Sequence, residues 1–162
     1  MYVAHEMQDP RWLVLTWRLP AASSTARVAT WRSLQRLGAV NLTPGAVILP
    51  HSEHLLEQLD WIAEDIVERG GDAYVLPVTE LSETEESDIR RRMREDSKEE
   101  YEKLRQAAEG LARRTVHKSR LGRKVTVLRR GLARAIERDH FESAGRARAE
   151  KAIRLAQKRK EA

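Results

Sequence analysis

The first half of the chain alternates between short apolar runs and longer segments with a periodic apolar face. Residues 12–17 form a run of aromatic, β-branched and leucine side chains that is too short for a stable helix and predicts a buried strand. Apolar side chains then recur at helical spacing over residues 23–38 and again over residues 52–70. These spacings predict two amphipathic helices with serine N-caps and glycine stops, with Trp31 and Ile62 on their core-facing sides.

Three further strands follow from turn chemistry. Residues 40–43 and 46–49 flank a Pro44–Gly45 pair, in which proline sets the first turn position and glycine tolerates the positive φ of the second, so the pattern predicts a hairpin. Residues 73–78 predict a last strand. Its proline cannot donate a hydrogen bond to a central ladder, so this strand belongs at an edge of the sheet.

The order strand, helix, hairpin, helix, strand predicts a split βαβ sheet with right-handed crossovers. The spatial order of the strands is then fourth, first, third, second, with both helices on one face. We therefore predict an α+β chain, with a ferredoxin-like βαββαβ sandwich over residues 1–81 and a helical C-terminal extension over residues 82–162. The second face of the sheet needs a cover, which the C-terminal helices or a homodimer could supply.

The second half contains no proline and is rich in arginine, alanine, glutamate and leucine, a composition that favours helices. One long helix is expected from Thr84 to about Ala108. A second apolar stripe over residues 125–136 predicts another helix, with Gly131 as a weak point. A last helix is expected from Ser143, with Ala147 among its buried residues.

Charge separates the two halves. Residues 1–81 hold six arginines and ten acidic residues, a net charge of −4, whereas residues 82–162 hold 24 basic and 15 acidic residues, a net charge of +9. The stretch 105–134 alone contains ten basic residues and one acid, Glu109. Several cations on one helical segment suit contacts with nucleic-acid phosphates. The predicted nucleic-acid-binding residues are Arg113, Arg114, Lys118, Arg120, Arg123, Lys124, Arg129, Arg130 and Arg134.

Two other interpretations of this basic segment stay open. It could form a solvated face that keeps the chain in solution, or it could pair with the acidic first domain. No helix-turn-helix pattern with a glycine turn is clear, so sequence-specific readout is less well supported than contact with the DNA backbone. The alternative function is a dimeric ferredoxin-like binding or scaffolding module without a nucleic-acid role.

Other chemistry is poorly supported. The chain has no cysteine, which excludes disulfides, thiolate metal sites and cysteine nucleophiles. His51, His54 and Glu57 have a spacing that could hold zinc, and an acidic group lies between Glu83 and Asp88, but polar residues at a helix start are usually solvated or favoured by the helix dipole. No catalytic spacing is present, so we expect no enzyme activity, no cofactor and no metal.

The N-terminus and the apolar runs bear on location. The first twelve residues lack a basic region followed by an apolar core, and no apolar run approaches the roughly 20 residues that span a bilayer. We therefore expect a cytoplasmic protein with no membrane partner.

Several strings resemble the N-terminal domain of the chromate-resistance regulator family called ChrB. They are WLVLTWRLP, WRSLQRLGAV, LTPGAVILP and the late IERDHF, and the resemblance runs from about Arg11 to the end of the chain. It implies a transcriptional regulator of chromate-efflux genes that is coupled to a second, C-terminal regulatory domain, which is absent here and would act as a separate partner. DNA and a second copy of the chain are the other expected partners. Chromate is a candidate ligand, but the sequence singles out no residues that would bind it.

More distantly, the βαββαβ pattern resembles the sheet shared by the CRISPR-associated adaptation nuclease and the middle domain of the phenylacetate-degradation repressor. In the nuclease a carboxylate follows the first strand and holds a metal. The corresponding stretch here, residues 16–20, reads TWRLP and contains no acid. The resemblance therefore does not extend to nuclease activity.

Overall fold

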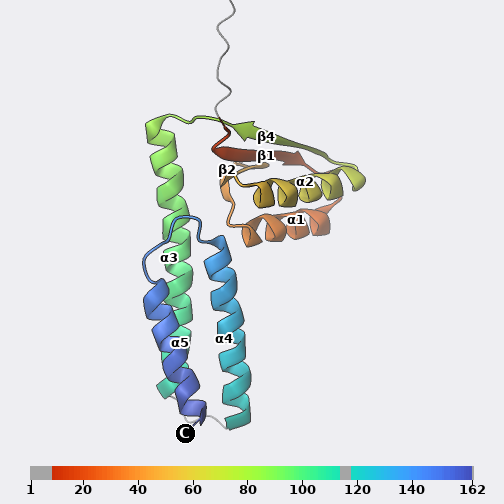
Figure 1. Cartoon of the computed structure of the whole chain (residues 1–162). Coiled ribbons are helices and arrows are strands. Elements are labelled where there is room, and N and C mark those ends of the chain that lie inside the picture. Colours follow the sequence, from red (N-terminus) through yellow and green to blue (C-terminus); the bar gives the residue numbers. More distant parts are fainter. Residues whose placement is uncertain (1–8, 114–117, 162) are drawn as a thin grey trace, which may run out of the picture. The chain divides into compact units, whose positions relative to one another are not determined.

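Figure 1 shows a computed structural model of the chain, which describes residues 9–113 and 118–161. Strand β1 (Trp12–Arg18) belongs to an antiparallel sheet, and its side chains alternate between the two faces of that sheet. The other strands are β2 (Val40–Thr43), β3 (Ala46–Pro50) and β4 (Asp72–Val78). Their spatial order is β2-β3-β1-β4, and every neighbouring pair is antiparallel. The predicted strand order and the edge position of the proline-containing strand are both confirmed.

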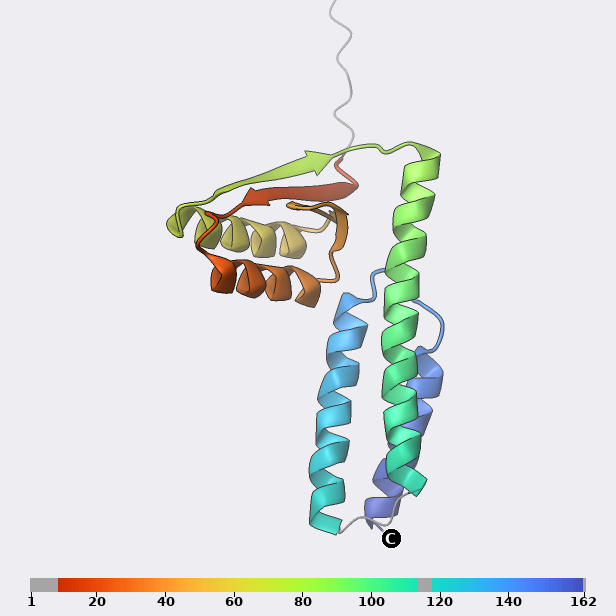
Figure 2. The same ribbon diagram turned by 180° about the vertical axis from the view of Figure 1, so that it is seen from behind.

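Helices α1 (Ser24–Arg36) and α2 (Glu53–Glu68) cover one face of this sheet (Figure 1, Figure 2). Leu13 and Leu15 from β1 join Leu34 of α1 in a fully buried core, to which α2 and β3 also contribute. Trp31 and Ile62 pack against this core and are only half-buried, so the predicted helix faces are right in direction although neither side chain is enclosed.

The two serine caps differ. Ser52 has an extended backbone, and its hydroxyl accepts a hydrogen bond from the Leu55 N–H at 3.1 Å, as expected for an N-cap. Ser23 makes no side-chain cap, because its backbone (φ −91°, ψ 49°) does not direct the hydroxyl at the helix. The Arg27 guanidinium instead donates to the carbonyl oxygens of Pro20 and Ala21 at 2.9 and 2.8 Å. The sequence offers Ser23, Ser24 and Thr25 as N-cap residues, and Ser23 takes the N-cap position without a side-chain cap hydrogen bond.

The β2–β3 turn depends on Gly45. Its φ is +80°, and its carbonyl oxygen accepts a hydrogen bond from the Trp17 N–H at 2.7 Å. A Cβ at this position would lie 2.6 Å from the Trp17 carbonyl oxygen. Glycine is thus required for both the turn and the close approach of β1.

The remaining helices are α3 (Glu83–Arg113), α4 (Lys118–Arg138) and α5 (Arg146–Glu161). The chain divides into two compact units, Met1–Asp88 and Ile89–Ala162, with the division inside α3. Ser82 and Glu85 start α3 with a reciprocal capping box, because the Ser82 hydroxyl accepts from the Glu85 N–H at 3.3 Å and the Glu85 carboxylate accepts from the Ser82 N–H at 3.2 Å. The hydrogen bond from Ser82 lowers the pKa of Glu85.

In the second unit the three helices lie side by side, and α4 runs antiparallel to α3 (Figure 1). Small apolar clusters join them, one of which contains Leu111 of α3, Leu121 of α4 and Ala156 of α5. Gly131 of α4 faces α3 at a point of close packing. A Cβ there would lie 3.0 Å from the Leu104 side chain, so glycine allows α3 and α4 to approach closely.

The last helix begins later than the sequence indicates. Glu142 and Gly145 both have positive φ, so the chain turns before α5 starts at Arg146 rather than at Ser143. The shift leaves Ala147 exposed, and Ala149 is buried instead. The predicted burial of Ala147 is therefore wrong.

The core-facing side of α1 can be tested with two substitutions on the same helix. Leu34 is fully buried, whereas Val28 is 48% exposed. We expect Leu34→Ala to lower the free energy of unfolding by about 2–5 kcal/mol, because it leaves a cavity, and Val28→Ala to change it by no more than about 0.5 kcal/mol. All four tryptophans lie in the first half of the chain, so urea unfolding followed by tryptophan fluorescence reports on this unit. Equal losses would mean that α1 presents a different face to the sheet.

Candidate nucleic-acid interface

The surface of α4 is divided into an apolar stripe and a basic stripe. Leu121, Val125 and Ala135 are buried against α3 and α5, and Leu128 and Leu132 pack beside them. At 100° per residue the side of the helix opposite this stripe carries residues spaced three and four apart. These are the exposed arginines Arg120, Arg123, Arg130 and Arg134, which we call the arginine stripe.

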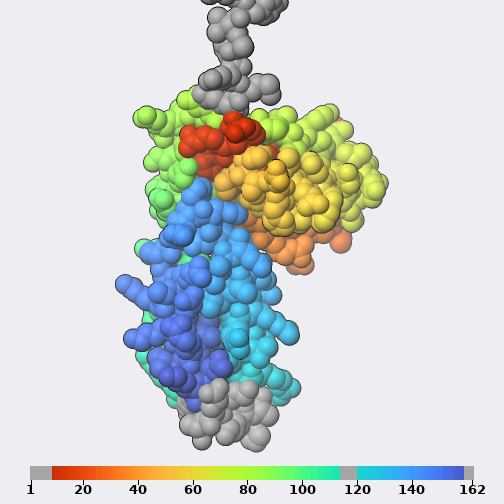
Figure 3. Space-filling view, in the orientation of Figure 1, coloured from red at the N-terminus to blue at the C-terminus, as the bar shows by residue number. Residues whose placement is uncertain are grey.

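The nine predicted contact residues therefore do not share one face. Within the part of the chain that the structure describes, Lys124 and Arg129 are also exposed, but the helical spacing puts them on opposite flanks of α4. Arg113 lies at the end of α3. Arg114 and the side chain of Lys118 lie outside the described residues. In the space-filling view, α4 in light blue forms an exposed surface beside the darker α5 (Figure 3).

Several cations on the other two helices pair with carboxylates of the same helix. Arg105 lies 2.5 Å from both Glu102 and Glu109. The hydrogen bond from Arg105 lowers the pKa of Glu102 to about 2, and the same contacts raise the pKa of Arg105. On α5, Glu150 accepts from Arg146 at 2.9 Å. Pairs at i,i+3 and i,i+4 of this kind offset part of the positive charge, although the sequence of α5 still holds seven basic residues against two acids.

Helix α4 lacks such compensation. Its sequence holds eight basic residues and one acid, Glu137. Among the described residues, none of the four arginines of the stripe, nor Lys124 or Arg129, has an ion pair with a carboxylate. Arg138, at the C-terminal end of α4, forms an ion pair with Glu100 of α3. The charge of α4 is therefore available to an external anion.

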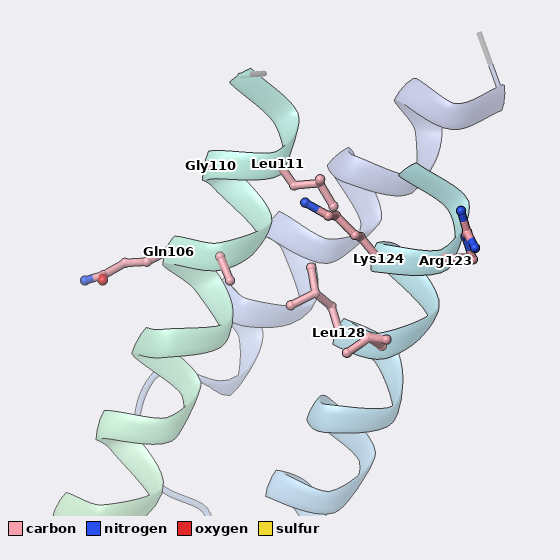
Figure 4. A pocket seen from close by; sticks show the side chains of 8 residues that line it. Gln106, Gly110, Leu111, Arg123, Lys124 and Leu128 are labelled. Atoms are coloured by element: carbon pink, nitrogen blue, oxygen red, sulfur yellow. The ribbon is translucent and has the colours of Figure 1, made fainter. Parts of the chain in front are cut away.

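A groove of about 540 Å³ lies between α3 and α4, and both Lys124 and Arg123 contribute to its lining. Leu111 of α3 and Val127 and Leu128 of α4 form its apolar walls (Figure 4). In the same view, Lys124 extends from α4 towards α3, whereas Arg123 points to the outer side of α4. These directions agree with the separation of the two residues expected from the helical spacing.

The corner between α4 and α5 holds the C-terminal end of α4 against α3. The Asp139 carboxylate accepts hydrogen bonds from the Tyr101 hydroxyl at 3.0 Å, from the Ser143 N–H at 2.8 Å and from the Ser143 hydroxyl at 2.6 Å. The guanidinium of Arg90 also stacks on the Phe141 ring, 4.5 Å from its centroid. Sequence reasoning did not identify this corner, because Tyr101 and Asp139 are 38 residues apart and the helical spacing that includes Tyr101 does not specify a partner for its hydroxyl.

No group of three potential metal-ligating side chains occurs among the residues that the structure describes. His54 is exposed at the start of α2 and His51 is half-buried before it. The acidic group at the start of α3 has structural partners, since Glu85 completes the capping box and Glu86 accepts from Arg11 at 2.8 Å. Nor is any described helix both long enough and apolar enough to cross a membrane.

Fold and surface together define an α+β sheet unit joined to a helical unit with an exposed basic face on α4. The chain belongs to the family described as "Protein ChrB, N-terminal", whose model matches residues 27–162. The resemblance seen in the sequence is thereby confirmed, although the matched segment begins after the first strand. A relative named Protein ChrB from Cupriavidus metallidurans is 34% identical over 82 residues, which cover 51% of this chain and 25% of that protein. The match thus spans about a quarter of the relative's length. No solved structure matches the chain.

The α4–α5 corner generates a pH-dependent prediction. Burial, followed by the hydrogen bond to Asp139, raises the pKa of Tyr101 above its usual value of about 10. The protonated hydroxyl therefore contributes its full stabilisation below about pH 10, and this contribution is lost as the pH rises towards the folded-state pKa.

We expect Tyr101→Phe to cost about 1 kcal/mol at pH 7, and the difference from the parent to shrink above about pH 10. Urea unfolding followed by far-UV circular dichroism at several pH values measures it. A difference that is constant up to pH 11, beyond the usual tyrosine pKa of about 10, would contradict the assigned role.

Proposed function

We propose that this chain is a DNA-binding regulatory domain of the chromate-resistance type and that the arginine stripe of α4 contacts the phosphates. Membership of the ChrB family supports the regulatory class. The observation that carries the DNA contact is the exposure of Arg120, Arg123, Arg130 and Arg134 without carboxylate partners among the described residues. The link to chromate rests on family membership alone, and no residue is assigned as a chromate ligand.

The dimensions of the stripe fit a duplex. Arg120 and Arg134 are 14 residues apart in the sequence, so they are separated by about 21 Å at about 1.5 Å per residue. One DNA strand places a phosphate about every 3.4 Å along the axis, so the stripe covers roughly six base-pair steps. Each arginine that replaces a condensed counterion adds a salt-dependent increment to the affinity. Such contacts position a protein on DNA and do not by themselves read the sequence.

For the first unit we propose the ferredoxin-like βαββαβ arrangement. The strand order and the two helices on one face support it. In this assignment the sheet unit is a platform and α4 is the element that binds the polyanion. The role is binding rather than catalysis, since no cluster of metal-ligating residues occurs in the described parts of the chain and no catalytic spacing occurs in the sequence.

A salt titration of DNA binding tests the stripe. With a labelled duplex of about 30 base pairs, we expect the parent's affinity to fall steeply between about 50 and 200 mM salt. The double variant Arg123→Gln/Arg130→Gln should bind more weakly to every sequence and reduce the slope of log affinity against log salt by up to about two. Both side chains are exposed, so circular dichroism should show an unchanged fold.

The matched control removes the same charge from α5. In Arg146→Gln/Arg154→Gln both arginines lie near Glu150, at 2.9 and 4.0 Å, so this carboxylate offsets part of their charge. We expect this variant to keep the parent's salt slope. Equal slopes for parent and stripe variant would move the DNA contact elsewhere. No DNA binding by the parent at low salt would favour the alternative, a dimeric binding or scaffolding module, whose oligomeric state sedimentation would then measure.

A further inference from the structure

Strand β4 is an edge strand with a free side. Among the described residues it pairs only with β1. The Trp17 N–H donates to the Gly45 carbonyl oxygen, so the backbone groups of Trp17 face β3. Backbone direction alternates along an antiparallel ladder, so the backbone groups of Leu13 and Leu15 face β3 as well. The intervening β1 residues bond to β4. It follows that Ala73 and Val75 direct their N–H and C=O groups away from β1, towards the free side.

A groove of about 620 Å³ runs beside this edge, between β4 and α2. Its apolar lining includes Ala63 and Val67 of α2 and Val75 of β4. Val67 is 55% exposed, and on the opposite face of β4 Tyr74 and Leu76 are 64% and 47% exposed. An added strand would therefore meet the backbone donors and acceptors of Ala73 and Val75, while Pro77 on the same side offers only its carbonyl oxygen. It would also meet apolar side chains on both faces.

The helix side of the groove is acidic. Asp60, Glu64 and Glu68 line it, and none of the three has an ion pair with a cation among the residues described. The neighbouring Asp65, by contrast, accepts from Arg69 at 2.7 Å. Basic side chains that point to the α2 side of an added strand would compensate these three carboxylates.

A second copy of the chain fits this edge poorly. Two-fold pairing of β4 with β4 would bring the acidic sides of two α2 helices together, and like charges in juxtaposition are unfavourable. Because side chains alternate along a strand, the best occupant has basic residues towards α2 and apolar residues towards Tyr74 and Leu76.

We propose that the β4 edge binds an extended segment of another protein in which basic and apolar residues alternate, added to the sheet as a fifth strand. This binding site is separate from the arginine stripe of α4 and does not depend on DNA binding.

A synthetic peptide of alternating lysine and valine, used as a fluorescent probe with the full chain, tests the proposal. We expect it to bind at least about tenfold more tightly than a peptide of the same composition with all lysines in one block. Binding should also slow hydrogen exchange at the Ala73 and Val75 amides. Absence of binding, or binding without protection of these amides, would overturn the proposal.

Charge variants of α2 provide the matched control. Glu64→Gln/Glu68→Gln should weaken peptide binding by roughly fivefold to tenfold. Glu53→Gln/Glu57→Gln makes the same charge change on the same helix at positions that do not line the groove. Because physiological salt screens exposed charges beyond about 8 Å, the affinity of this variant for the peptide should stay within about twofold of the parent's. Equal weakening of peptide binding by both variants would show non-specific attraction and contradict the proposal. Self-association of the chain that protects the Ala73 and Val75 amides without peptide would also contradict it.

Discussion

Burial of the apolar stripe on α4 is the constraint on which the basic surface depends. Leu121 and Val125 pack against α3 and α5, and this contact sets the rotation of the helix about its own axis. Once that rotation is set, arginines three and four residues apart on the opposite side must face solvent. A helix with the same composition but scattered apolar positions would distribute its cations around the axis. The arginine stripe is therefore a consequence of core packing and needs no separate interaction to orient it.

Electrostatic compensation then distinguishes the helices from one another. Some cations of α3 and α5 lie within one turn of glutamates that offset their charge, as Arg105 with Glu102 and Arg146 with Glu150 illustrate. Helix α4 has one acid among eight cations, so no local arrangement could neutralise it. The sheet unit carries negative charge at the groove, where three carboxylates of α2 beside the free strand edge have no ion pair among the described residues. We infer two binding surfaces of opposite charge, one for a polyanion and one for a basic strand.

The α4–α5 corner fixes where the basic helix ends. Asp139 collects hydrogen bonds from Tyr101 and Ser143, while Arg138 pairs with Glu100. These polar contacts turn the chain before α5, which begins at Arg146 because Glu142 and Gly145 adopt positive φ. The sequence pattern placed this start three residues too early, since alanines at helical spacing carry no information about a turn built from distant partners. At the start of α1, Ser23 occupies the N-cap position without a side-chain cap hydrogen bond, so a residue type that favours capping does not guarantee the bond.

What the sequence determined by itself is local. The Pro44–Gly45 turn, the edge position of the strand with Pro77 and the amphipathic division of α4 all follow from conformational preference and periodicity within a few residues. Tertiary structure decided which of the nine predicted cations share a face, which are compensated by carboxylates, and that the free side of β4 adjoins an acidic groove. Pairings such as Tyr101 with Asp139 join residues 38 positions apart. Only the packing of whole helices brings such residues together, because no local preference specifies the partner.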